Sequence, residues 1–556
     1  MKTSKKLIAS ILALVLILCV AACGQQATPA GESTPGAASP AQSEQQKQEQ
    51  KGDDTKADVV VSYPMKTDKS FTLWTDKGND AIAACYSDAT ESPYHIGLEK
   101  NTGVKVEYIL PDISAGAAQA FNLMMNDSTL PDLINANISV GDASMLLDEG
   151  VIWDLTDYIP TYAPDYWEFL NRPGNEVLLK SVKDDNGRIF GAGTFRESFY
   201  NVVYIGPVIR QDWLDECGLK APVTLEDWEN VLITFKEKYN APFGFTLDRF
   251  STGLSSGTGA YAAFFYGEYV DDNGKIQCAN VQPEWKELLE TLHKWYEMGL
   301  IDQDSFTIHD DAVRTKAINN EIGVSFTAMS QLTNFVSDAE AQGTGAKWVG
   351  FEYPRTAPGA PTSMIAAGNL NMGKYTMITK ELTEEEMIIA LEWLNYGFTE
   401  EGMMYNNFGT EGETYTINAN GEVEFTSLIT DDPDGLNEAV KKYTICHSAP
   451  FSGVQLQRHV QLKNTQESVD AVYKWIDNTD VGKHYVPGIA LSSEESAAYS
   501  DKVSPIKTYV NEMALKFVTG EEDLANFDAF VKTLQNMGLD ECLALRQAAY
   551  DRYISR

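Results

Sequence analysis

The sequence predicts a mixed α/β protein built from two lobes, and three observations support that fold class. About 490 residues follow a polar N-terminal segment, and 11% of the chain is aromatic, which is enough apolar material for a large core. A single core seldom extends beyond roughly 250 to 300 residues, so a chain of this length is expected to divide. Strand-like and helix-like patterns alternate, and no second low-complexity linker separates them.

The first structured segment reads as a βαβ unit. Residues Ser70 to Trp74 (SFTLW) and Gly103 to Ile109 (GVKVEYI) have the composition and alternation of strands. Between them, Ser92 can cap a short helix that ends near Asn101, with Pro93 in its first turn.

Two capping boxes mark helix starts further along. Thr224 with Asp227, and Thr383 with Glu386, each place an acidic side chain three residues after a threonine and before an apolar stripe. A third stripe occupies residues 524–537. Stripes at helical spacing are typical of a core, so we assign none of them to a site.

The N-terminus carries an export signal. Lysines among the first six residues precede an apolar run, Leu7 to Val20, that is too short to span the ~30 Å membrane core. Val20-Ala21-Ala22-Cys23 resembles a bacterial lipobox, which implies cleavage after residue 22 and a lipid on Cys23. The alternative is an ordinary signal with an incidental cysteine.

A flexible linker follows the signal. Residues 24–57 contain no aromatic and no large aliphatic side chain, so they cannot bury enough apolar surface to offset their ordering entropy. We expect residues 1–22 to be the signal peptide and 23–68 a lipid-anchored linker, whose disordered part has a coil dimension of about 30 Å.

Charge and cysteine content exclude several classes of partner and site. The net charge is −37, and about −40 without the signal lysines, which argues against binding nucleic acid. Five cysteines after Cys23 are scattered without a C-x-x-C pair, so we expect free thiols rather than zinc or a disulfide framework: Cys85, Cys217, Cys278, Cys446 and Cys542.

Catalytic motifs are sparse. No phosphate loop, zinc helix or nucleotide turn occurs, so no cofactor, metal or catalytic residue is predicted. The G-x-S-x-G at 253–257 lacks the strand that a nucleophile elbow needs. Asp-Asp-Asn-Gly occurs at 184–187 and at 271–274. We interpret both as hairpin turns rather than calcium loops, because neither continues to the glutamate of an EF-hand loop. Calcium binding stays open.

Several longer sequence blocks occur in a characteristic order. They include PDLINANISVGDASMLLDEGVIWDLTDYIPTYAPDYW (131–167), DDNGRIFGAGTFRESFYNVVYIGPVIRQDWLDECGL (184–219), LHKWYEMGLIDQDSF (292–306) and ALEWLNYGFTEEGMMYNNFGTEGETYTINANG (390–421). Together these blocks resemble the family-1 extracellular solute-binding proteins of ABC sugar importers, and the resemblance covers residues 69–553.

The resemblance implies a periplasmic-binding-protein type II fold, with two α/β lobes, a hinge and a central ligand cleft. The approximate N-terminal lobe is 69–194 with 375–430, and the C-terminal lobe is 195–374 with 431–556. The same resemblance implies a monomer that is lipid-anchored at the extracellular face of the cell membrane. Such a protein captures an oligosaccharide and delivers it to an ABC permease without catalysing a reaction.

Ligand contacts in this fold are expected on loops at strand ends, from aromatic plates and from planar polar side chains. The N-terminal candidates are Trp74, Asp76, Asn135, Asn137 and Asp142. A core role for Trp74 and a helix cap for Asp142 are the alternatives.

Further candidates lie near the expected crossovers between lobes. Phe195, Arg196 and Glu197 form the strongest group, and Asp248, Arg249 and Phe250 follow a strand in the other lobe, where a surface ion pair is the alternative. Weaker candidates flank the return crossings: Gln331, Asn334, Trp348, Asn369 and Asn371.

Two other functions stay open at this point. A secreted glycan hydrolase or lyase needs two carboxylates at a set separation, which the sequence cannot measure. An adhesion or sensor lipoprotein would bind a ligand without a transport partner. Arg196 and Arg249 suit a carboxylate, but both can also balance nearby acids, so neutral and uronic-acid sugars both remain.

Overall fold

The computed structural model describes residues 60–76, 91–247, 249–250, 264–355, 357–360, 370–444, 452–477 and 479–556. Residues 1–57 and 58–556 are separate units, and all that follows concerns the second. Its strands are β1 Ser70–Thr75, β2 Lys105–Ile109, β3 Leu133–Asn137, β4 Ala192–Arg196, β5 Ile205–Arg210, β6 Glu268–Val270, β7 Ile276–Cys278, β8 Val324–Ala328, β9 Trp348–Gly350, β10 Asn371–Ile378, β11 Tyr415–Ile417, β12 Val423–Phe425 and β13 Gly453–Gln455.

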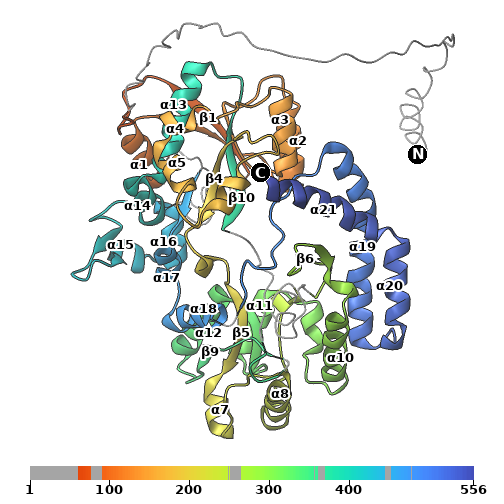
Figure 1. Ribbon diagram of the computed structural model, residues 1–556. Helices are drawn as coiled ribbons and strands as arrows, with labels where there is room; N and C mark the ends of the chain where they lie inside the picture. Colours follow the sequence, from red (N-terminus) through yellow and green to blue (C-terminus); the bar gives the residue numbers. More distant parts are fainter. Residues whose placement is uncertain are drawn as a thin grey trace, which may run out of the picture. The chain divides into compact units, whose positions relative to one another are not determined.

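The helices carry most of the remaining described chain (Figure 1). They are α1 Pro93–Thr102, α2 Ala117–Met125, α3 Val140–Asp148, α4 Ile159–Tyr162, α5 Pro164–Leu170, α6 Glu176–Ser181, α7 Gln211–Cys217, α8 Leu225–Tyr239, α10 Pro283–Glu297, α11 Asp310–Ile318, α12 Met329–Gln342, α13 Glu384–Asn395, α14 Glu400–Phe408, α15 Ser427–Thr430, α16 Leu436–Tyr443, α17 Gln457–Leu462, α18 Gln466–Ile476, α19 Ser493–Thr519, α20 Phe527–Asn536 and α21 Leu539–Ser555. Short 3₁₀ turns include η3 Phe199–Asn201 and η6 Tyr396–Phe398.

The larger sheet has six strands in the order β13-β4-β10-β3-β1-β2. Strand β1 pairs in parallel with β2 and with β3, and α1 lies between β1 and β2 in the chain, which confirms the predicted βαβ opening. Strand β10 pairs antiparallel with both of its neighbours, so it runs against the other five strands. A segment from late in the chain therefore completes the middle of a sheet that the early chain begins.

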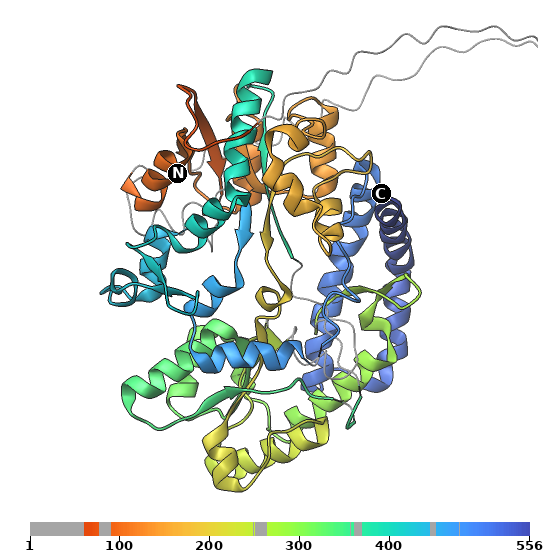
Figure 2. The ribbon, with the colours of Figure 1, turned by 60° about the vertical axis from the view of Figure 1, so that its left-hand side comes forward.

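A smaller sheet, in the order β8-β5-β9, lies in the other half of the fold. Both neighbours pair antiparallel with β5, and helices α12 and α18 pack against each other and against β9. In Figures 1 and 2 the blue helices α19, α20 and α21 lie side by side, and α19 also packs on α10.

The buried apolar side chains form two large clusters. One is drawn mainly from residues 71–195 and 375–405, and the other mainly from 200–353 and 469–542. Strand β13 lies in the six-stranded sheet although it follows residue 431. The lobe boundaries stated above stay a prediction, but two cores are what a chain of this length requires.

Most local signals read from the sequence are confirmed in the described residues, with two exceptions. Ser92 precedes α1, but its side chain makes no capping hydrogen bond. The strand expected just before Asp248 does not form, since Phe243 makes only isolated bridges there. Thr224 and Thr383 both cap their helices through complete capping boxes. Asp184 and Asp271 both begin tight turns, closed by backbone bonds from Gly187 and Gly274. Among the described cysteines none is bridged: Cys278 and Cys542 are buried free thiols, and Cys217 is partly buried.

Some predictions fall outside the described residues. These are the signal, Cys23, the linker to residue 59, the G-x-S-x-G at 253–257, Cys85 and Cys446. In the part of the chain that is described, no helix combines the length and the apolar character needed to cross a membrane.

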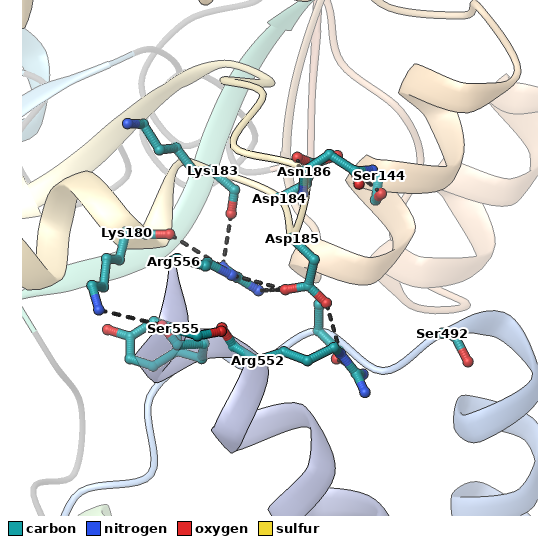
Figure 3. A network of polar contacts seen from close by, with 12 residues as sticks. Ser144, Lys180, Lys183, Asp184, Asp185, Asn186, Ser492, Arg552, Ser555 and Arg556 are labelled. Atoms are coloured by element: carbon teal, nitrogen blue, oxygen red, sulfur yellow. Dashed lines mark hydrogen bonds and ion pairs between the residues drawn. The ribbon is translucent and has the colours of Figure 1, made fainter. Parts of the chain in front are cut away.

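The end of α21 is tied to the turn after α6 by a network that we call the C-terminal clamp (Figure 3). Arg556 and Arg552 both bind the carboxylate of Asp185, Arg552 through Nε at 2.9 Å. Arg556 also donates to the Lys183 carbonyl at 2.9 Å, and Lys180 donates to carbonyls of the last turn of α21. The clamp thus joins α6, which packs in the first core, to a helix that begins in the second.

Replacing Arg556 tests how much the clamp stabilises the fold. The side chain is only 4% exposed, so Arg556→Ala leaves Asp185 and two backbone carbonyls under-satisfied. We expect the free energy of unfolding in urea to fall by about 1–3 kcal/mol. Lys516→Ala, which removes an exposed helical ion pair, is the control and should change it by less than about 0.5 kcal/mol. Equal effects of the two variants would show that the clamp is a surface feature only.

Arg552 of the clamp also binds Glu495 of α19, with Nη2 to Oε2 at 2.6 Å, and this ion pair should contribute to acid sensitivity. Hydrogen bonds from Arg552 lower the pKa of Glu495 below its ordinary value. A carboxyl with a lowered pKa in the folded state stabilises the fold above its unfolded pKa of about 4.3, and this contribution is lost as the pH falls towards the folded value. Glu495→Gln should therefore have a shallower loss of unfolding free energy between about pH 5 and about pH 3 than the wild type. Gln can still accept the bond from the Ser492 amide, so the helix cap is retained. Parallel pH curves would contradict this assignment.

Candidate functional site

A cavity of about 620 Å³ opens at one edge of the six-stranded sheet. Three neighbouring strands contribute to it: Arg196 ends β4, Gln455 ends β13, and Met372 lies at the start of the oppositely directed β10. The carboxyl ends of β4 and β13 and the amino end of β10 lie at the same edge. The volume is in the range of ligand pockets.

The second wall comes from the smaller sheet. Tyr204 stands just before β5, and Met329, Ser330 and Thr333 lie in the first turns of α12, directly after β8. Ile205 is paired with Ala328, so these segments are side by side. The Met329 amide donates to the Tyr204 carbonyl at 2.7 Å. The cavity therefore lies between the edges of two sheets that belong to two cores.

Helices α16 and α17 supply the remaining lining. Side chains from α16 and its C-cap are Asn437, Glu438, Val440, Lys441 and Thr444, and those from α17 and the turn after it are Val460, Lys463 and Asn464. Thr333 donates to Asn464 at 2.9 Å, and this bond fixes the turn against α12.

The crossover from β4 to β5 is held firmly beside the cavity. The amide of Glu197 and the side-chain amide of Asn201 both donate to the Gln455 carbonyl, each at 3.0 Å. The amide of Gln457 donates back to the Glu197 carboxylate at 2.6 Å. These bonds fix the backbone that carries Arg196 and Tyr204, so the cavity wall is pre-organised.

The lining suits a polar ligand with some apolar surface. Asn201, Asn437, Asn464 and Gln455 offer amides that both donate and accept, as sugar hydroxyls require. Tyr204, Met329, Met372, Val440 and Val460 offer apolar contact area. Arg196 is partly buried, and burial lowers the pKa of its guanidinium, which still stays charged at neutral pH.

Of the predicted candidates that lie in the described residues, Arg196 is the one that lines this cavity. Phe195, its neighbour, points the other way and is fully buried between Phe169 and Phe398. Glu197 is exposed and accepts the bond from Gln457.

The N-terminal candidates lie elsewhere. Trp74 and Asn135 are buried in the sheet, and Asn135 donates to Thr376 at 2.9 Å. Asp76 forms a buried ion pair with Lys374 of β10 at 2.9 Å, with side chains 5% and 7% exposed. Asn137 is exposed at the end of β3, and Asp142 is exposed in the first turn of α3, where Ser139 donates to it.

The candidates from the other lobe are mostly engaged in structure. Arg249 forms an ion pair with Asp310 at 2.9 Å, and Phe250 is buried and stacked on Phe245. The weaker candidates are also engaged: Gln331 accepts a bond from Asn334, Trp348 is buried, and Asn371 donates to Ser181 and Tyr375. Asp248 and Asn369 lie outside the described residues.

The sequence reasoning missed the cavity residues of α16 and α17. Within α16, Ala439 and Val440 are buried while Asn437 is exposed, so its amphipathic pattern was visible. No local sequence pattern predicts which cavity the polar face of a helix will line. For α16 and α17 the position depends on the pairing of β13 with β4, which are far apart in the chain. In the described chain no group of three or more His, Cys, Asp or Glu side chains could hold a metal ion.

Known proteins share both the sequence pattern and the architecture of this chain. The fructooligosaccharide ABC transporter substrate-binding protein FusA of Streptococcus pneumoniae serotype 4 is 22% identical over 534 residues, covering 89% of this chain and 92% of FusA. Lipoprotein LipO of Bacillus subtilis strain 168 is 24% identical over 475 residues, covering 82% and 88%. An HMO-binding solute-binding protein of Bifidobacterium longum infantis has a solved structure that matches with a TM-score of 0.70 at 20% identity, covering 87% of this chain and 99% of that one.

These similarities confirm the predicted two-lobed α/β fold. The model of the bacterial extracellular solute-binding protein family matches residues 81–404, which is more than half of the chain. The chain thus belongs to the bacterial extracellular solute-binding proteins, the family that the sequence blocks predicted.

Proposed function

We propose that the protein captures an oligosaccharide in the cavity between its two sheets and delivers it, chemically unchanged, to an ABC permease. The cavity carries this proposal: it combines amides and hydroxyls with apolar side chains, as sugars require, and its walls come from two separate cores. Closure of such walls over a ligand changes the shape that a permease would meet. The related FusA is named as a fructooligosaccharide-binding transport protein.

Oligosaccharide binding can be tested by calorimetry and thermal unfolding. The probes are kestose, maltotriose, mannotriose and trigalacturonate, with a tripeptide and spermidine as non-sugar controls. A ligand at about 100 times its Kd should raise the unfolding free energy by about 2.7 kcal/mol. Asn437→Ala should weaken binding about tenfold, because it removes a lining amide, whereas Asn122→Ala on exposed α2 should not. Binding of peptide or polyamine in place of every sugar would overturn the proposal.

The same incubations separate a receptor from an enzyme. Chromatography should recover each bound oligosaccharide intact after prolonged incubation. Reproducible cleavage products would favour the hydrolase or lyase alternative.

We also propose that Cys23 carries the lipid anchor that holds the protein at the outer face of the membrane. The lipobox-like Val20-Ala21-Ala22-Cys23 and the polar linker support it, since two acyl chains give stable attachment. Cys23→Ser should move the protein from the membrane pellet to the medium, whereas Cys19→Ser should leave it in the pellet. Retention of the Cys23→Ser protein in the pellet would contradict the anchor.

A further inference from the structure

One wall of the cavity is formed by a part of the chain that packs separately from the two large cores. Helix α16 and its C-cap line the cavity, yet the buried side chains beneath the helix form a small cluster of their own: Ile429, Ala439 and Val440. The hairpin of β11 and β12 and the short helix α15 precede α16, and α15 packs on it. The polar side chains of this wall are therefore mounted apart from both sheets.

Ion pairs and a cap hold α16 in place. Lys442, which is outside the described cavity lining, binds both Asp432 and Asp434 at 2.9 Å and so fixes the turn before the helix. The Thr444 hydroxyl donates to the Val440 carbonyl at 2.9 Å and caps the other end. Side chains on the cavity face of α16 thus start from a fixed backbone, which lowers the ordering cost of binding.

The cavity face of α16 carries a carboxylate and an ammonium group side by side. Nζ of Lys441 lies 2.7 Å from Oε1 of Glu438, and the two side chains are 35% and 38% exposed. Among the described residues this is the one polar contact of either side chain. The second carboxylate oxygen can still accept, and the ammonium group has further hydrogens to donate.

Two neighbouring hydroxyls of a sugar match such a pair. One hydroxyl can donate to the carboxylate while its neighbour on the next ring carbon accepts from the ammonium group. Hydrogen bonds to ionised groups are roughly twice as strong as neutral ones. The pair carries no net charge, so it suits an uncharged part of a ligand. A partly exposed ion pair contributes little to stability, so fold stability alone gives weak reason for its position.

We propose that Glu438 and Lys441 together recognise a vicinal diol of the bound oligosaccharide and act as specificity-determining residues of the cavity. This inference rests on the proposed function and adds to it the feature of the ligand that is read. A sugar residue with an ester, an ether or a glycosidic linkage at either hydroxyl would lose one of the two bonds and bind less tightly.

Deoxy sugars test whether a diol is read. Calorimetry on the full chain compares kestose, maltotriose, mannotriose and trigalacturonate, each with analogues that lack one hydroxyl at a time. For at least one of these sugars we expect two hydroxyls on adjacent carbons to be required, so that removing either weakens binding at least about tenfold. Required hydroxyls that are never on adjacent carbons would overturn the inference.

Substitutions show whether Glu438 and Lys441 are the partners of that diol. Glu438→Ala should weaken the parent sugar at least about tenfold. In this variant, removing the hydroxyl that binds the carboxylate should cost less than about threefold, because its partner is already lost. Lys441→Met should behave in the same way towards the neighbouring hydroxyl. A merely structural role would weaken the parent and every analogue equally and leave the deoxy penalties unchanged, which would overturn the inference.

A matched control and the sugar panel separate this inference from the proposed function. Glu512→Ala breaks a comparable pair with Lys516 on exposed α19, at 2.6 Å, and should leave every affinity within about twofold. Unfolding curves establish that each variant is folded, and Lys441→Met serves if Glu438→Ala does not fold. Sugar binding with unchanged deoxy penalties overturns this inference alone. Failure of all four sugars to bind overturns both.

Discussion

The insertion of β10 between β3 and β4 is the constraint on which the rest of the structure depends. The chain leaves the first sheet at Arg196, builds most of the second core, and returns at Asn371 to fill the gap between two strands already placed. Until it returns, β3 and β4 have unpaired edges, and buried backbone groups without partners are costly. The two cores therefore depend on each other. The strand ends that line the cavity come together only because the chain crosses from the first sheet to the second core and back.

The cavity is a direct consequence of that pairing. Because β13 joins the same sheet on the other side of β4, three strand ends from distant parts of the chain meet at one edge. The second sheet presents β5 and β8 at its own edge through the pair Ile205 and Ala328. Arg196 and Phe195 illustrate the result: adjacent residues on one strand face the cavity and the core, as a period of two requires. The C-terminal clamp links the two halves a second time, away from this edge.

The structure also shows how two polar candidates near the ends of early strands are engaged. Asp76 follows the buried strand β1, whereas Asn135 lies in the middle of β3. Lys374 of β10 pairs with Asp76, and Thr376 of β10 accepts a hydrogen bond from Asn135. From sequence, an acidic residue after a strand is equally suited to a ligand or to a buried partner. Lys374 is almost 300 residues from Asp76 along the chain, and no local pattern announces such a pairing.

The sequence alone determined the features that depend on near neighbours in the chain. The capping boxes at Thr224 and Thr383, the turns after Asp184 and Asp271, the βαβ opening and the family blocks all follow from residues a few positions apart. It also reached Arg196, because that residue directly follows a recognisable strand at a crossover. Only the tertiary structure decided that α16 and α17 complete the cavity. The physical reason is that strand pairing between β4, β10 and β13 depends on which distant segments bury each other's edges, and a single sequence does not display that choice.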